Sequence, residues 1–262
     1  MPGSPFSLEG KVSIVTGGGV GIGKSIAIEF ARAGADVVIA SRKLENLEPV
    51  SAEIRSIGRR SFAMGVDVRN EDQVRDLVER TARELGKLDI MVNNAGASFM
   101  ARPEDITMNG WNAVVGINLN GVFFGCKWAG KRMMQQGGGV IVNVASTAGI
   151  YGSVMMSHYG AAKAAVINLT RALGTAWTRQ NIRVNCIAPG PIETQGYLDN
   201  LHKIVPDPEA VYKAVASRVA MGRWGKVQEI AYPCIFLASE ASSFMTGETI
   251  VVDGGPPSRE SA

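Results

Sequence analysis

Three side chains in the middle of the chain have the residue types and the spacing of a proton-transfer site. Tyr159 and Lys163 are four residues apart, so on a helix they share one face. An ammonium beside a phenol stabilises the phenolate and is expected to lower the pKa of Tyr159 from about 10. Ser146 follows the apolar run 140–145, and its hydroxyl could hydrogen-bond the oxygen that the tyrosine protonates. The group predicts general acid catalysis, although a Tyr-x-x-x-Lys pair alone is also common on ordinary helix surfaces.

These residues need a scaffold, and the chain alternates apolar strands with amphipathic helices. We expect strands at 11–16, 36–40, 61–67, 88–92, 140–145, 182–187 and 249–252. We expect helices at 24–33, 44–57, 71–85, 107–135, from the segment after Ser146 to about 179, and at 227–237. Such strands are typical of a parallel sheet covered by helices on both faces. Residues 1–262 are therefore predicted to form a single doubly wound (Rossmann) α/β domain, with its site beyond the carboxyl ends of the strands.

A glycine-rich turn joins the first strand to the first helix. It carries Gly17, Gly19, Gly21 and Gly23, with Ile22 between the last two. Glycines let the backbone approach a pyrophosphate, and the helix N-terminus offers free N–H groups. A tight structural turn is the alternative, but the position at the first strand-to-helix junction favours a nucleotide site.

The end of the second strand bears on the choice between NAD and NADP. Asp36 opens this strand and therefore points away from the site, whereas Ser41, Arg42 and Lys43 follow its end. No acid is expected there to hold a ribose 2′-hydroxyl, and Arg42 could grip a 2′-phosphate through two hydrogen bonds. A solvated basic turn is the alternative. We predict NADP(H) as the cofactor.

Polar or small residues also follow the third and fourth strands. Asp67 could accept a hydrogen bond from an adenine amino group, or it could cap the following turn. Asn93 and Asn94 are expected to brace neighbouring strands, and the small pair Ala95 and Gly96 would let a ribose lie close.

The motifs occur in the order seen in the short-chain dehydrogenases/reductases, and the chain resembles this family over about residues 8–255. They are Thr16-Gly-x-x-x-Gly-x-Gly23, Asn93-Asn-Ala-Gly96, Asn118, Ser146, Tyr159-x-x-x-Lys163 and Pro189-Gly-Pro-Ile-Glu-Thr194. The thirteen-residue step from Ser146 to Tyr159 adds to the specificity of the match.

The resemblance implies a role for each matching residue. Tyr159 would be the catalytic acid and base, Ser146 would hold the substrate oxygen, and Lys163 would bind the nicotinamide ribose. Asn118 would anchor a water molecule for proton supply, and Thr194 would hold the carboxamide. The cofactor-binding set would comprise Gly17, Gly19, Gly21, Ile22, Gly23, Ser41, Arg42, Asp67, Val68, Asn94, Ala95, Gly96, Tyr159, Lys163, Pro189, Gly190, Ile192 and Thr194.

The segment 191–222, which we call the lid, has weak periodicity and is expected to cover the substrate. Its Tyr197, Val205 and Tyr212, with Met100, Val154, Met155 and Met156 outside it, indicate an apolar pocket. The motif set looks most like 3-oxoacyl-[acyl-carrier-protein] reductases. This favours NADPH-dependent reduction of a 3-oxoacyl thioester or a similar ketone, in fatty acid metabolism. A steroid, cyclic-ketone or sugar/polyol dehydrogenase and an enoyl-thioester reductase stay open, with a non-catalytic NADP-binding sensor as a remote alternative.

The composition of the chain limits the kinds of binding partner that we expect. Hydrophobic residues make up 46% of the 262 residues, and the net charge of +3 shows no basic run, so neither nucleic acid nor a membrane surface is expected. No apolar run approaches the ~20 residues of a membrane span. The three cysteines are far apart and no histidine cluster exists, so neither a disulfide framework nor a metal site is expected. The N-terminus does not read as a signal peptide, so we expect a cytoplasmic protein. The resemblance further implies a homotetramer.

Overall fold

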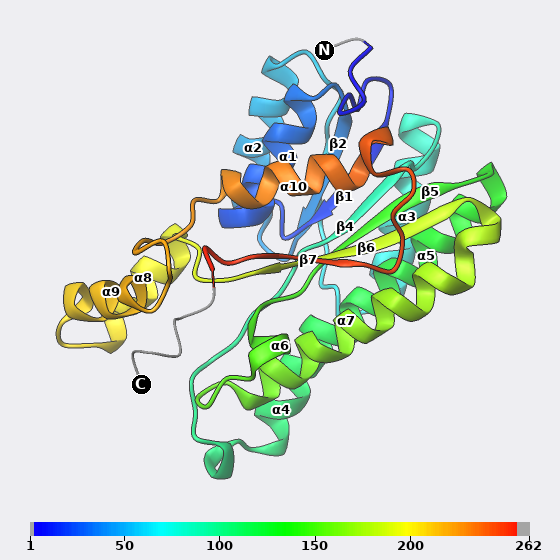
Figure 1. The fold of residues 1–262 in the computed structure, drawn as a ribbon. Helices are drawn as coiled ribbons and strands as arrows, with labels where there is room; N and C mark the ends of the chain where they lie inside the picture. Colours follow the sequence, from blue (N-terminus) through cyan, green and yellow to red (C-terminus); the bar gives the residue numbers. More distant parts are fainter. Residues whose placement is uncertain (1–2, 256–262) are drawn as a thin grey trace.

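A computed structural model describes residues 3–255, except for the side chains of 200–204. Its described strands form one parallel sheet in the order β3-β2-β1-β4-β5-β6-β7 (Figure 1). The strands are β1 (Val12–Thr16), β2 (Asp36–Ser41), β3 (Ala63–Gly65), β4 (Ile90–Asn93), β5 (Gly139–Val144), β6 (Ile182–Pro189) and β7 (Thr249–Val252). The strand order changes direction between β1 and β4, which is the topological switch point of a doubly wound sheet. The predicted fold class is confirmed.

Helices cover both faces of this sheet (Figure 1). One face carries α1 (Gly21–Arg32), α2 (Leu44–Ser56) and α10 (Gln228–Ala238), and the other carries α3 (Glu71–Leu85), α5 (Gly121–Gln136) and α7 (Ser157–Trp177). Four further helices lie outside these layers: α4 (Met108–Val115), α6 (Ala148–Tyr151), α8 (Gln195–Ile204) and α9 (Pro208–Ser217).

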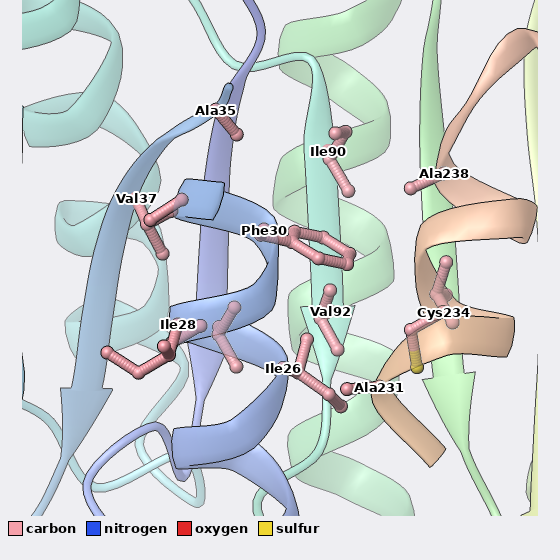
Figure 2. Close-up of a cluster of buried hydrophobic side chains, with 14 of the residues drawn as sticks. Ile26, Ile28, Phe30, Ala35, Val37, Ile90, Val92, Ala231, Cys234 and Ala238 are labelled. Atoms are coloured by element: carbon pink, nitrogen blue, oxygen red, sulfur yellow. The ribbon is translucent and has the colours of Figure 1, made fainter. Parts of the chain in front are cut away.

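Two apolar cores, one on each face, fix the strands that carry the candidate site. On the first face, Phe30 of α1 is fully buried in the same cluster as Ile90 and Val92 of β4 and Cys234 of α10 (Figure 2). Burying one such side chain contributes roughly 1.5–3 kcal/mol. The strands are apolar on both sides because both sides are covered, and their carboxyl ends are held in register.

Three differences between the structure and the expected elements bear on the site and its lid. The first helix begins at Gly21, so the turn residues supply its first N–H groups. The long helix expected at 107–135 is divided by a π-helical turn at Gly116–Asn120. The lid contains two helices, α8 and α9, where weak periodicity was expected. The Asp207 side chain accepts a hydrogen bond from the Ala210 N–H, so Pro208 stands at the start of a capped helix.

The three cysteines are not joined by disulfide bonds, and the helices are those of a protein packed around a sheet. Cys126, Cys186 and Cys234 are buried free thiols. Over residues 3–255, no helix has both the length and the apolar character that crossing a bilayer needs. The same residues contain no group of three or more His, Cys, Asp or Glu side chains arranged to hold a metal ion.

Candidate active site

Ser146, Tyr159 and Lys163 meet at the carboxyl end of β5. Lys163 is 2% exposed, and its Nζ donates to the carbonyl of Val144, the last residue of β5, at 2.7 Å. The same Nζ lies 5.6 Å from the centre of the Tyr159 ring. The Oγ of Ser146 accepts from the Ala148 N–H at 3.1 Å, so its own hydrogen remains available for donation. Strand β5 and helix α7 thus bring the three predicted side chains to one place.

Burial controls the ionisation of this group. It raises the pKa of Tyr159, and the neighbouring Ser146 hydroxyl acts weakly in the opposite direction. Burial also lowers the pKa of Lys163 to about 8, against an opposing interaction with Cys186. The pKa of Tyr159 in this structure is therefore raised, against the predicted lowering, because loss of hydration is the largest influence on the phenol.

Asn118 lies in the π-helical turn and is completely buried. Its Nδ2 donates to the carbonyl of Ala97 at 2.6 Å and to that of Val114 at 2.9 Å. Its Oδ1 has no hydrogen-bond partner among the described residues. A Cβ on Gly96 would lie 2.7 Å from this oxygen and 3.6 Å from the Nζ of Lys163, so both groups face Gly96. A buried acceptor held this way fits a hydroxyl-bearing group bound against Gly96.

The glycine-rich turn has the conformation and the free donors that an anion needs. Gly17 and Gly21 have φ angles of +67° and +53°, in the left-handed region that favours glycine. A Cβ on Gly17 would also lie 2.8 Å from the Nδ2 of Asn94. Helix α1 has no side-chain N-cap, so its first N–H groups point into the turn without a partner from a cap. These features fit a pyrophosphate.

Asn94 and Ala95 hold the turn against the neighbouring strand. The Nδ2 of Asn94 donates to the carbonyl of Thr16 at 2.9 Å, and the N–H groups of Asn94 and Ala95 donate to the Thr16 Oγ1. The side chain of Asn93 donates to Asn143 on β5 at 2.9 Å. Both amides therefore brace strands, as expected from the sequence.

The cation Arg42 follows the end of β2, whereas the acid Asp36 stands at the start of this strand and does not face the site. Asp36 accepts a hydrogen bond from the Arg60 Nε at 2.7 Å, at the opposite end of the strand from Ser41. Arg42 follows Ser41 and is exposed. The prediction that Asp36 faces away from the site agrees with this geometry.

Asp67 behaves as a turn cap in this structure. Both of its carboxylate oxygens accept hydrogen bonds from the Arg69 guanidinium, and Oδ1 also accepts from the Arg69 N–H at 3.0 Å. These bonds lower the pKa of Asp67, and the charge of Arg42 adds to the effect. Val68, the next residue, is buried. The capping alternative for Asp67 is thus realised, and its adenine contact stays a prediction.

A cavity of about 600 Å³ opens at this edge of the sheet. The predicted site residues that line it are Ile22, Asn94, Gly96, Ser146, Tyr159, Lys163, Pro189, Gly190, Ile192 and Thr194. The predicted residues outside its lining are Gly17, Gly19, Gly21, Gly23, Ser41, Arg42, Asp67, Val68, Ala95 and Asn118. The first set comes from the segments after β1, β4, β5 and β6 and from α7, so residues far apart in sequence share one cavity.

Comparison with known proteins gives the family. A family model described as enoyl-(acyl carrier protein) reductase matches residues 18–256. The 3-oxoacyl-[acyl-carrier-protein] reductase FabG of Thermotoga maritima is 38% identical over 95% of this chain and 98% of its own length. The chain is a short-chain dehydrogenase/reductase. It is therefore an oxidoreductase.

Solved structures of other short-chain dehydrogenases/reductases share its shape. A protein described as an NAD(P)-dependent gluconate 5-dehydrogenase of Beutenbergia cavernae, with bound NADP, has a TM-score of 0.89 at 34% identity, covering 96% of this chain and 98% of its own. An NAD+-bound xylitol dehydrogenase has a TM-score of 0.90 at 33% identity, covering 94% of this chain and 99% of its own. These relatives carry thioester, sugar-acid and polyol names, so the substrate must be inferred from the pocket of this short-chain dehydrogenase/reductase.

The pocket wall agrees in part with the apolar residues expected from the sequence. Met100 and Met156 line the cavity, as predicted. Val154 and Met155 do not; Val154 is 81% exposed. Sequence reasoning also missed Phe99 and Trp224, which line the wall. Trp224 falls between the lid and the next expected helix, where no periodicity points to it.

Proposed function

We propose that this short-chain dehydrogenase/reductase is an NADPH-dependent enzyme that reversibly reduces a ketone to a secondary alcohol. Its preferred substrate would be a 3-oxoacyl thioester or a similarly apolar ketone. The observation that carries the proposal is the convergence of Ser146, Tyr159 and Lys163 on a cavity with otherwise mostly apolar walls. Residues 1–262 would act as one catalytic domain, with the lid at 191–222 over the substrate.

The chain has groups suited to each part of the cofactor, which supplies the hydride. The glycine turn 17–23 would hold the pyrophosphate, and Ser41 with Arg42 the 2′-phosphate. Asp67 and Val68 would border the adenine. The ribose and carboxamide end would contact Asn94, Ala95, Gly96, Tyr159, Lys163, Pro189, Gly190, Ile192 and Thr194.

The side chains divide the proton chemistry among them. Tyr159 keeps its proton at neutral pH because burial raises its pKa, and it would donate that proton to the carbonyl oxygen as negative charge develops there. Ser146 would donate a second hydrogen bond to the same oxygen and stabilise the charge. The Lys163 ammonium beside the phenol ring would stabilise the phenolate left behind. Asn118, with its buried acceptor facing Gly96, would help to return a proton to Lys163.

The pocket wall supports an uncharged, apolar substrate. Lys163 is the one charged side chain among the described residues that line the cavity. Phe99, Met100, Tyr197 and Trp224 supply large apolar surfaces around it. A sugar-acid carboxylate would meet no cation here except the lysine that serves the tyrosine, and its desolvation would go uncompensated. An acyl chain would bury apolar area against the same wall.

A panel of carbonyl compounds tests the substrate class by the rate of NADPH oxidation. The panel comprises N-acetylcysteamine thioesters of acetoacetate, 3-oxooctanoate and crotonate, together with cyclohexanone, xylulose and 5-ketogluconate. We expect kcat/KM for the 3-oxooctanoyl thioester to exceed that for 5-ketogluconate by about 100-fold or more. The reason is that the carboxylate of 5-ketogluconate would be buried in the cavity without a partner of opposite charge. A sugar or the crotonyl thioester as the best substrate would contradict the proposal.

The choice of NADPH can be tested separately from the substrate. NADPH should raise the melting temperature more than NADH does at equal concentration, because the tighter ligand stabilises more. Replacing Arg42 with Ala should weaken NADPH binding about tenfold and leave NADH binding unchanged, the loss of one charge-assisted contact. Lys43→Ala is the matched control. Equal effects of Arg42→Ala on both cofactors would argue against a 2′-phosphate contact.

We further propose that the enzyme is a cytoplasmic homotetramer that acts in fatty acid metabolism. Exposed apolar side chains support assembly: Val251 lies on the edge strand β7, and Phe244 lies in the segment that leads to this strand. The three buried free thiols suit a reducing compartment.

A further inference from the structure

Trp224 lies where the lid, the cavity and the chain leading to α10 meet. The indole is 6% exposed and lines the cavity. The ring of Tyr212, from α9, stacks on it with 5.1 Å between ring centres and an interplanar angle of 18°. The ring of Tyr197, from α8, lies 4.9 Å away at 50°. The indole Nε1 also donates to the Tyr212 carbonyl at 3.0 Å. One tryptophan therefore contacts both lid helices.

The loop before the lid is tied to the same place. The Glu193 N–H donates to the carbonyl of Gly225, next to Trp224, at 2.8 Å, and the Gly225 N–H donates to the carbonyl of Pro191 at 2.9 Å. The phenol of Tyr212 donates to the Glu193 Oε2 at 2.5 Å. This carboxylate raises the pKa of Tyr212, so the phenol keeps the proton that it donates.

Thr194 connects this arrangement to the cofactor side of the cavity. Its Oγ1 accepts from the N–H of Tyr197 at 3.2 Å and so caps the start of α8. The hydroxyl hydrogen stays free to donate into the cavity that Thr194 lines. On its other side, the Thr194 Cγ2 lies 3.3 Å from the position of a Cβ on Gly21, in the glycine turn.

These contacts form a closed ring through Thr194, Tyr197, Trp224, Tyr212 and Glu193, since the first and last are neighbours in the chain. We propose that Trp224 is a positioning residue that makes the two lid helices and the Thr194 loop move as one unit. When bound cofactor fixes the position of Thr194, it also fixes α9 through Trp224. In the same way, a substrate that contacts the indole of Trp224 also restricts the position of Thr194. The inference rests on the proposed function only for the identity of the cofactor and substrate.

The coupling can be measured without any carbonyl substrate. Lys213 lies on α9 with an exposed side chain, so the rate of tryptic cleavage after it reports local opening of that helix. We expect saturating NADPH to slow this cleavage about tenfold in the wild type, a usual size for coupling between two sites. In Trp224→Ala the protection should fall below about twofold, while the fluorescence of bound NADPH shows that the cofactor still binds.

Conservative variants separate positioning from packing. Trp224→Phe keeps an aromatic ring for the stack. In this variant NADPH should still slow cleavage about threefold, compared with about tenfold in the wild type. Tyr212→Phe loses only a solvent-exposed hydrogen bond to Glu193. The factor by which NADPH slows cleavage should therefore be about half of the wild-type factor. Trp128→Phe, a matched change on α5 outside the cavity, should behave as the wild type. Full protection in Trp224→Ala, or no protection in the wild type, would overturn the inference.

A kinetic readout extends the test to the substrate side. Trp224→Ala should lower kcat/KM for the 3-oxooctanoyl thioester about tenfold more than for the acetoacetyl thioester, because only the longer chain reaches the indole. Equal losses for both thioesters would contradict contact between the chain and Trp224. If the wild type reduces no ketone, the proposed function fails, and the proteolysis result still decides the role of Trp224.

Discussion

At the scale of single residues, the site is governed by two buried groups whose pKa values move in opposite directions. Burial raises the pKa of Tyr159 and lowers that of Lys163 to about 8. In the free enzyme at neutral pH both are therefore protonated, and Lys163 is the first of the two to lose its proton as the pH rises. The lysine, and not the tyrosine, should thus set the alkaline limit for carbonyl reduction.

The pH dependence of reduction follows from this order. The ammonium form of Lys163 stabilises the phenolate, and it is lost as the pH rises through about 8. With NADPH as the varied substrate, kcat/KM should be flat below this pH and should fall about tenfold for each further unit. A profile that stays level up to pH 10 would show that the charge of Lys163 is not required.

The proton donor itself is tested by removing one oxygen atom. Tyr159→Phe should lower kcat by about 10²-fold or more, the range for loss of a general acid, and NADPH affinity should change little. Ser146→Ala should lower kcat by a similar or smaller factor, because Tyr159 still protonates the product. Turnover near the wild-type value in Tyr159→Phe would refute the assignment of the acid.

Some of these residues could be found from the sequence and others could not. Ser146, Tyr159 and Lys163 have informative spacing because a strand end and a helix face fix their relative positions. The phenol pKa was misjudged because desolvation depends on what packs around a side chain, which spacing does not reveal. Trp224 has no periodic neighbours, and its role arises from contacts with Tyr197 and Tyr212, twelve or more residues away in the chain.

At the scale of elements, the strands and main helices were predictable because their apolar periodicity matches the buried faces. The π-helical turn at Gly116–Asn120 was not, because it changes one hydrogen-bond step and leaves the apolar pattern of the helix almost intact. The lid helix α9 was missed because the segment 191–222 has weak periodicity; the helix begins at Pro208, which occupies its first turn behind an Asp207 cap.

The turn between β1 and α1 gives a test at this scale. Gly17→Ala places a Cβ at a φ of +67° and 2.8 Å from the Asn94 Nδ2, so it strains the backbone and displaces Asn94. The backbone term alone should cost about 1–2 kcal/mol in the free energy of unfolding, seen as a lower melting temperature. NADPH binding should weaken about tenfold because the phosphate turn shifts.

A matched glycine isolates the local effect. Gly86 has a φ of +92° at the end of α3, and a Cβ there would meet open space. Gly86→Ala should therefore show a similar loss of stability from the backbone and unchanged NADPH affinity. If both variants bind NADPH like the wild type, the turn does not hold the phosphates.

At the scale of the whole molecule, one edge of the sheet stands out. Strand β7 forms this edge, with half-exposed Val251, and the nearby Phe244 is fully exposed. Monomers rarely leave large apolar side chains next to an open edge strand, since both invite association. This edge is the surface on which the proposed tetramer would be built.

A charge at that edge should disrupt the assembly. We expect the wild type to have the mass of four chains by light scattering, and Phe244→Glu to shift the population to smaller species without changing the far-ultraviolet spectrum. Leu44→Glu, at an exposed apolar position on α2 far along the sheet, is the control and should keep the wild-type mass. A wild-type monomer, or an unchanged mass in Phe244→Glu, would contradict assembly through this edge.

The strand order also bears on how the chain is made. After β2 and β3 have formed on one side of β1, β4 pairs with the other side of β1, and β5, β6 and β7 each add outside the strand before them. A ribosome delivers these strands in the same order, so every new strand finds its neighbour already emerged and no earlier pair has to open. From β4 onward the growing sheet has one advancing edge, which would need shielding from other nascent chains until β7 arrives.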